Sequence, residues 1–308
     1  MHCSRKEEKR MKRKTHKLKS ESKACWIILA ILMLLCLLPM IMIVSSSLTD
    51  EQYIVQNGYS LFPKKTTLDT YIFLIGNKGK MLLKAFLITL IVTVLGTVYQ
   101  VTITTLFAYA VTQKKEVFRF TRILSFFAWF TTIFGGGVVP WYILCTQYYG
   151  LQNNIWALFI PYGFNVFNMF ILRSSFRGIP GELIESAKLD GASNSRIFIK
   201  IALPLARAGI LTVSLFTIFG LWNDFYLPQW LTTKSDLQTL QKILYSMLTN
   251  VEQLLHNTQM SSYMDKIILP TQTAKLAVAV MAMIPLVVLY PFSLKYFVKG
   301  VNVGGVKG

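Results

Sequence analysis

Seven polar and aromatic residues are the groups of this chain best suited to bind a ligand. They lie in or beside two apolar stretches, and they are Tyr162, Asn165, Asn168, Trp222, Asn223, Asp224 and Tyr226. Amides match the hydroxyl groups of sugars, and aromatic rings match their apolar C–H faces. The pattern therefore predicts a translocation path for a sugar. Asparagines that join helices and an aromatic belt at the membrane surface explain the same residues equally well.

The residue types needed for enzyme chemistry are scattered. His2, His16 and His256 lie far apart, and no Ser/His/Asp set, metal-ligand spacing or Walker A sequence is present. The four cysteines show no paired spacing, which argues against a disulfide framework or a metal site. We therefore expect no catalytic residue and no bound metal, and we expect energy to come from a partner or an ion gradient.

The composition is that of a membrane protein. Of the 308 residues, 53% are hydrophobic and 15% are charged, whereas a soluble domain has about 25% charged residues. Apolar runs long enough to span a bilayer recur. We predict an all-α membrane protein with six spans, at about 24–44, 82–111, 123–134, 155–172, 206–222 and 273–290. The glycines at 135–137 end the third span before a short outer helix, and Pro161 and Gly163 bend the fourth.

The basic residues indicate the orientation of the chain. Ten of the 32 lie within the first 23 residues, without an RNA-binding module, so we expect this arm to lie on anionic lipid and not on nucleic acid. With six spans, 23 of the 32 fall on one side, which predicts that both termini are cytoplasmic. The chain then divides into an arm (1–23), a permease domain (24–298) with a cytoplasmic loop (177–204) and an external stretch (224–272), and a glycine-rich tail (299–308).

The stretch 179–204 has the pattern of two short helices at an angle. Pro180 fixes φ where the first helix begins, and Gly191 is its natural end because glycine adopts a left-handed backbone at little cost. Ser193 is placed to cap the second helix. Pro204 disfavours the α conformation at the residue before it, so we expect it to mark the return to the membrane.

The same stretch resembles the EAA loop of ABC importer permeases, whose pattern is EAA-x3-G-x9-I-x-L-P. The matching positions, with serine at the second as the only departure, are Glu185, Ser186, Ala187, Gly191, Ile201, Leu203 and Pro204; Asp190 and Ala192 fit the D-G-A run common in that family. In that family the loop docks into a cleft on a cytoplasmic ATPase. The resemblance implies this coupling role here, and an ordinary helical hairpin between two spans is the alternative.

The C-terminal tail adds a second resemblance. Residues 299–308 end in a G-G-V-K-G run similar to the tail of the second membrane subunit of maltose-type sugar permeases, which reaches between the ATPase subunits. The resemblance implies contacts with the ATPases for Asn302, Gly304, Gly305 and Lys307. Together with Trp222 and Asn223 at the end of the fifth span, it is most similar to the branch that handles oligosaccharides from complex polysaccharides.

These resemblances imply the membrane subunit of a type I importer in a bacterial plasma membrane. Its expected partners are a homologous second permease, two ATPase subunits that bind ATP and Mg, an extracytoplasmic solute-binding (lipo)protein, a sugar and membrane lipid; no cofactor is expected on this chain. An ion-coupled secondary transporter would need ionisable groups within its spans, and Lys84 and Lys275 lie near outer span ends instead. A membrane receptor or scaffold remains a third class.

Overall fold

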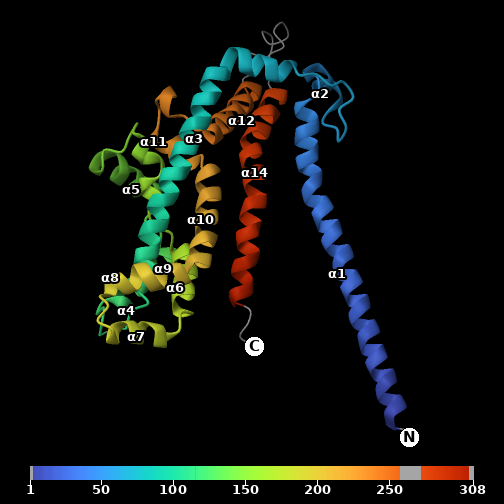
Figure 1. Cartoon of the computed structure of the whole chain (residues 1–308). Coiled ribbons are helices and arrows are strands. Elements are labelled where there is room, and N and C mark those ends of the chain that lie inside the picture. The colour runs from blue at the N-terminus through green and yellow to red at the C-terminus, as the bar shows by residue number, and fades with distance from the viewer. Residues whose placement is uncertain (1–2, 115, 257–271, 305–308) are drawn as a thin grey trace. The chain divides into compact units, whose positions relative to one another are not determined.

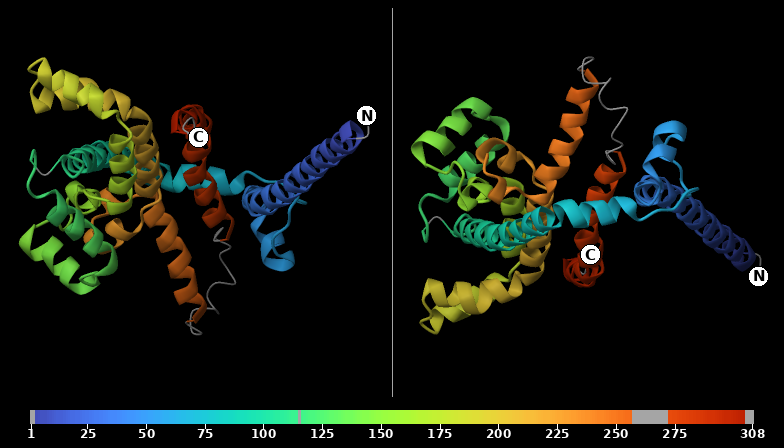
Figure 2. Two further views of the ribbon diagram at one scale, coloured as in Figure 1. Left: turned by 90° about the horizontal axis from the view of Figure 1, so that it is seen from below. Right: turned by 90° about the horizontal axis from the view of Figure 1, so that it is seen from above.

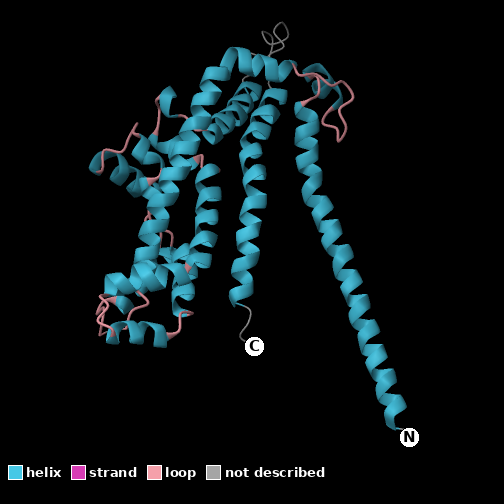
Figure 3. Cartoon of the chain, viewed as in Figure 1, coloured by secondary structure: helices cyan, strands magenta, loops and turns pink. Residues whose placement is uncertain are grey.

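The computed structural model describes residues 3–114, 116–256 and 272–304. Within these ranges the chain is helical, and the isolated bridge between Thr49 and Thr66 is the one extended pairing (Figure 3). The chain forms two compact units, residues 1–74 with 262–280 and residues 75–261 with 281–308. Two long helices, α3 (Asp69–Ala110) and α14 (Gln272–Gly304), contribute to both units (Figure 1).

The first unit contains α1 (Cys3–Ser47), α2 (Glu51–Asn57) and the beginnings of α3 and α14. Glu51 is buried, and its carboxylate accepts hydrogen bonds from the backbone amides of Gln272 (2.9 Å) and Thr273 (2.8 Å). A carboxylate at this position stabilises the N-terminus of α14 through the helix dipole. The Thr70 and Thr273 hydroxyls, 2.8 Å apart, join α3 to the same helix end.

The second unit holds most of the helices. They are α4 (Thr121–Ile133), α5 (Val138–Ile143), η1 (Leu144–Tyr148), η2 (Ile155–Leu158), η3 (Ile160–Tyr162), α6 (Val166–Arg177), α7 (Gly181–Leu189), α8 (Asn194–Ile197), η4 (Phe198–Ala202), α9 (Leu203–Leu205), α10 (Arg207–Trp222), α11 (Tyr226–Leu231), η5 (Ser235–Leu237) and α12 (Leu240–His256). Within this unit, α7 and α8 lie at one end, and α11 and α12 lie at the other (Figure 1).

Apolar helices of membrane-spanning length are present. In the described ranges two helices qualify alone, Cys25–Ser47 and Lys78–Ala110, and up to five spans result if each bent pair counts as one. The pairs are Thr121–Ile133 with Val138–Tyr148 (117°), Ile155–Tyr162 with Val166–Arg177 (55°) and Asn194–Leu205 with Arg207–Trp222 (74°). The segment Gln272–Val288 is a shorter apolar helix. The predicted break at 135–137 is confirmed, and the bend predicted at Pro161 and Gly163 lies at 163–165, between Tyr162 and Val166.

Two sequence-based expectations need correction. Leu203 has α-helical angles (φ −59°, ψ −49°) although Pro204 follows it. The wider π-type turn at 198–202 precedes this proline, so the missing proline N–H breaks no regular ladder there, and the chain bends instead at Ala206. The external stretch also contains a 17-residue helix, α12, that we did not predict, and α14 continues to Gly304.

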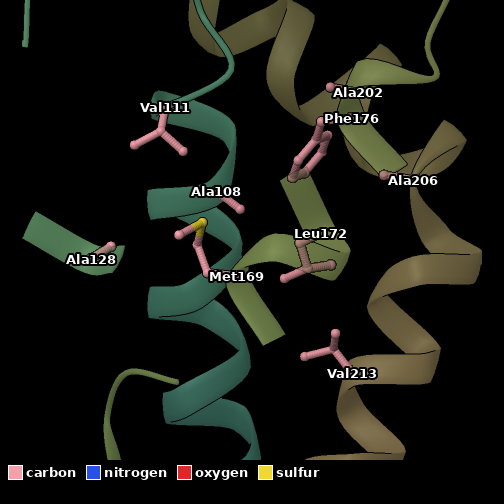
Figure 4. Close-up of a cluster of buried hydrophobic side chains, with 9 residues drawn as sticks. All are labelled: Ala108, Val111, Ala128, Met169, Leu172, Phe176, Ala202, Ala206 and Val213. Carbon is pink, nitrogen blue, oxygen red and sulfur yellow. The ribbon is translucent and has the colours of Figure 1, made fainter. Parts of the chain in front are cut away.

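The core of the second unit lies between α3, α4, α6 and α10. Its nine buried residues are Ala108, Val111, Ala128, Met169, Leu172, Phe176, Ala202, Ala206 and Val213 (Figure 4). Four of the nine are alanines, and small side chains let helices approach closely in a membrane. At Gly209 on α10 an added Cβ would lie 2.8 Å from the Cβ of Ser175 on α6, which shows how near the two helices come.

Candidate functional site

The α7–α8 hairpin (residues 181–197) is built by local backbone interactions. Gly191 has φ +76°, its amide donates to the Lys188 carbonyl (3.0 Å), and the Ala192 amide donates to the Ala187 carbonyl (2.9 Å). These two bonds form a Schellman motif, which satisfies the last carbonyls of α7. The Ser193 hydroxyl then accepts from the Arg196 amide (3.3 Å) at the start of α8. The predicted helix end and cap are confirmed.

The hairpin presents an uncovered surface. No residue of α7 is buried, and Leu189 at its end is 89% exposed. Residues 194–205 lie at 74° to α10, so α8 runs across that helix and not along it (Figure 2). Leu189 is therefore an exposed apolar side chain at the end of the unit, and no other part of the described chain covers it.

The predicted coupling residues lie along the hairpin and the turns that follow it. Ser186 and Asp190 are exposed, Ala187, Ala192 and Ile201 are half-buried, and Pro204 is exposed. Leu203 packs against the core cluster, which joins the hairpin to α6 and α10. Glu185 forms an exposed ion pair with Lys114 (3.4 Å), and such a pair stabilises by about 1 kcal/mol or less.

A cavity of ≈ 320 Å³ lies between α3, the 160–165 segment, α6 and α10. We call it the amide-lined cavity because three amide side chains line it, those of Gln100, Asn165 and Asn168. The other lining residues are Pro161, Tyr162, Phe164, Phe216, Thr217, Gly220, Leu221 and Asp224. Neutral hydrogen-bonding groups beside aromatic rings are the usual lining of a small-molecule site.

Internal hydrogen bonds fix several of these groups. Asn165 caps α6, since its Oδ1 accepts a hydrogen bond from the backbone amide of Asn168 (3.0 Å). The side chain of Asn168 donates through Nδ2 to the Thr217 hydroxyl (3.3 Å). The Tyr162 hydroxyl donates to Asp224 Oδ1 (3.0 Å). Because these bonds join the 160–165 segment to α6 and α10, the polar wall of the cavity is preorganised.

The short helix α11 lies between two charged groups that match its dipole. Asp224 accepts from the Tyr226 (3.1 Å) and Leu227 (3.3 Å) amides at one end. At the other end, the buried ammonium of Lys242 donates to the carbonyls of Pro228 (3.0 Å) and Thr232. Burial raises the pKa of Asp224, although these hydrogen bonds oppose the rise, and burial lowers the pKa of Lys242.

The structure brings together four of the seven residues predicted for the path. Tyr162, Asn165, Asn168 and Asp224 line the amide-lined cavity, whereas Trp222, Asn223 and Tyr226 do not.

The other three predicted residues have different surroundings. Trp222 is buried, and its Nε1 donates to the Ala282 carbonyl (3.0 Å). Asn223 is exposed and accepts from Gln241 (3.3 Å). The ring of Tyr226 lies 5.7 Å from that of Trp141.

Sequence reasoning missed Gln100 and the aromatic residues Phe164 and Phe216. The available signal for Gln100 was a lone amide inside a 33-residue apolar helix segment. The two phenylalanines carried no signal, because phenylalanine is common on every face of a membrane helix. In the tail, Asn302 and Gly304 belong to the end of α14, while Gly305 and Lys307 lie outside the described residues.

Comparisons with known proteins give one consistent result. The family described as "Binding-protein-dependent transport system inner membrane component" matches residues 26–303. The chain is 34% identical over 280 residues (89% of this chain, 94% of the relative) to the polygalacturonan/rhamnogalacturonan transport system permease protein YtcP of Bacillus subtilis (strain 168). It is 26% identical over 312 residues (97% and 100%) to the arabinooligosaccharides transport system permease protein AraQ of Halalkalibacterium halodurans.

A solved structure agrees with these relatives. It is the crystal structure of a bacterial ABC transporter involved in the import of the acidic polysaccharide alginate. The TM-score is 0.76 at 26% identity, and the match covers 91% of this chain and 97% of that chain.

Proposed function

Because the chain belongs to the family of binding-protein-dependent transport system inner membrane components, we propose that it is a permease subunit of an ATP-driven importer of oligosaccharides. The relatives named for polygalacturonan/rhamnogalacturonan and arabinooligosaccharides, and the solved importer of alginate, support a saccharide as the substrate. The chain itself would form part of the translocation path and would not hydrolyse ATP.

The exposure of the α7–α8 hairpin is the observation that best supports a coupling role. Its end presents Leu189 without a cover, and its continuation packs Leu203 and Phe198 against the core formed by α3, α4, α6 and α10. A displacement of the hairpin by a docked ATPase would therefore move α6 and α10 directly. Both of these helices line the amide-lined cavity, so the same displacement would change the path.

The proposed topology has six spans with both termini in the cytoplasm. Lys and Arg gather on the side of the hairpin, as the positive-inside rule requires. The hairpin would face the cytoplasm, and α11 and α12, at the opposite end of the second unit, would face outward (Figure 1). This arrangement places the hairpin on the side where ATP is available.

The proposed partners follow from the family. They are a homologous second permease, two ATPase subunits with ATP and Mg, and an extracytoplasmic binding protein that delivers the sugar. The C-terminal residues Asn302, Gly304, Gly305 and Lys307 would contact the ATPases. Tyr162, Asn165, Asn168 and Asp224 would contribute to the path through the amide-lined cavity.

Purification of the tagged chain from its host in mild detergent, followed by mass spectrometry, tests this proposal. We expect a second permease and an ATPase, with a solute-binding protein recovered after crosslinking. Leu189→Glu should lose the ATPase but keep the second permease, because Leu189 touches little else in this chain. Leu248→Glu is the matched control, since Leu248 is 48% exposed on α12, away from the hairpin.

A different outcome of the purification would refute the proposed function. Recovery of the chain alone, together with uptake that survives ATP depletion but collapses with the proton gradient, would refute the ATP-driven importer. The chain would then act as an ion-coupled transporter.

A further inference from the structure

Gln100 carries a side-chain amide that faces the amide-lined cavity and forms no hydrogen bond with the described residues. The residue is 8% exposed in the last third of α3, and it lines the amide-lined cavity. Within the described part of the chain, no hydrogen-bond partner exists for this amide. An amide that faces a cavity and has no protein partner is free to form hydrogen bonds with a ligand or water in that cavity.

The remaining bonding capacity of the cavity contains both donors and acceptors. Asn165 uses its oxygen to cap α6 and keeps its NH₂ group, whereas Asn168 uses its NH₂ group toward Thr217 and keeps its oxygen. Gln100 offers both. Sugar hydroxyls donate and accept in the same way, and the rings of Tyr162 and Phe216 supply surface for C–H faces.

The charge of the cavity is of one sign. Among the described residues that line it, Asp224 is the one charged residue, and none is Lys, Arg or His. A ligand carboxylate would lose its hydration here and would meet another carboxylate without a compensating cation. A uronate is therefore a poor occupant, whereas an uncharged sugar ring meets no such cost.

We propose that the amide-lined cavity selects uncharged glycosyl units over uronates, and that Gln100 is the specificity-determining residue. This inference rests on the proposed function, because it takes the cavity to be part of a saccharide path. It separates this chain from the solved importer to which it is similar, which imports an acidic polysaccharide, and from the relative named for polygalacturonan, a polymer of uronates.

A pair of trisaccharides with one skeleton tests the selection by charge. Trigalacturonate and its fully methyl-esterified form would be titrated separately onto the purified transporter complex without its binding protein, with binding followed by saturation-transfer NMR. We expect the neutral ester to bind at least about tenfold more tightly than the charged form. Equal or tighter binding of trigalacturonate overturns the proposal.

Two variants test Gln100. Gln100→Leu should weaken binding of the ester by about five- to tenfold, the effect of losing a hydrogen bond to a neutral group. The isosteric Gln100→Glu should keep ester binding within about threefold and weaken trigalacturonate further, because it adds a second negative charge. Gln147→Leu, at an exposed glutamine outside the cavity, is the matched control and should bind as the wild type does.

The outcomes separate the inference from the function on which it rests. Wild-type binding by both Gln100 variants overturns the assignment to Gln100. Absence of binding by either trisaccharide, in a complex that contains the ATPase and hydrolyses ATP, overturns the selectivity and leaves the importer intact. A chain that purifies without an ATPase refutes the proposed function itself.

Discussion

Substitution of Gly191 is the sharpest test of how the α7–α8 hairpin works. Its φ of +76° is a left-handed backbone, and an added Cβ would meet no atom within 4 Å. The cost of a side chain here is therefore conformational and not steric. For an L-residue the left-handed region costs about 1–2 kcal/mol, and a β-branched residue lies at the upper end of that range.

We expect almost all of this conformational cost to reduce the affinity of the ATPase for the hairpin. No residue of α7 is buried, so the alternative to the native turn, a frayed end of α7, has little packing to lose. A cost of about 1–2 kcal/mol then depletes the native turn by about 5- to 30-fold and weakens ATPase binding by the same factor. We expect the loss of ATPase affinity to lie near the upper end of this range for Gly191→Val and near the lower end for Gly191→Ala. For Gly191→Asn the affinity should stay within about threefold of wild type, because asparagine tolerates this backbone.

The assay is the affinity of the purified ATPase for the permease pair in detergent micelles. Gly181→Val is the matched control: Gly181 also has no atom within 4 Å of an added Cβ, it lies in α7, and its φ is outside the left-handed region. It should bind as wild type does. If Gly191→Val matches wild type at equal expression, or if Gly181→Val is equally impaired, the left-handed turn is not what docking requires.

Two further substitutions test the packing of the second unit, and thermal unfolding in detergent measures both. Lys242→Met should destabilise the unit by about 2–3 kcal/mol, because the ammonium that caps the end of α11 is lost and a buried carbonyl is left unpaired. Lys234→Met is the control: it changes an exposed lysine nearby and should have no effect on the unfolding midpoint. Gly96→Ala should cost about 1–3 kcal/mol, since its Cβ would lie 2.9 Å from the Cβ of Phe159 and would force two elements apart. Gly79→Ala in the same helix has room and should unfold as wild type does; equal midpoints within either pair would contradict the packing described above.

The α7–α8 hairpin was predictable because its determinants are local. The left-handed glycine, the Schellman bonds and the Ser193 cap all join residues within five positions of one another. Their geometry depends on backbone preferences that each residue carries with it. The apolar helices and the breaks near 135–137 and 161–163 were predictable for the same reason, since the effects of Gly and Pro on a helix are local.

The cavity could not be predicted because its walls come from distant segments. Gln100 on α3, Asn165 before α6 and Phe216 on α10 meet only through the packing of their helices. Which face of an apolar helix points inward is undetermined when lipid and core are equally apolar, so Trp222 was assigned to the path although it is buried against α14.

The sequence by itself therefore determined the class of the molecule, its apolar helices and the form of its hairpin, whose causes are short-range. Only the tertiary structure decided which polar groups share a cavity and which of them, as at Gln100, remain without a partner, because those facts depend on contacts between helices far apart in the chain.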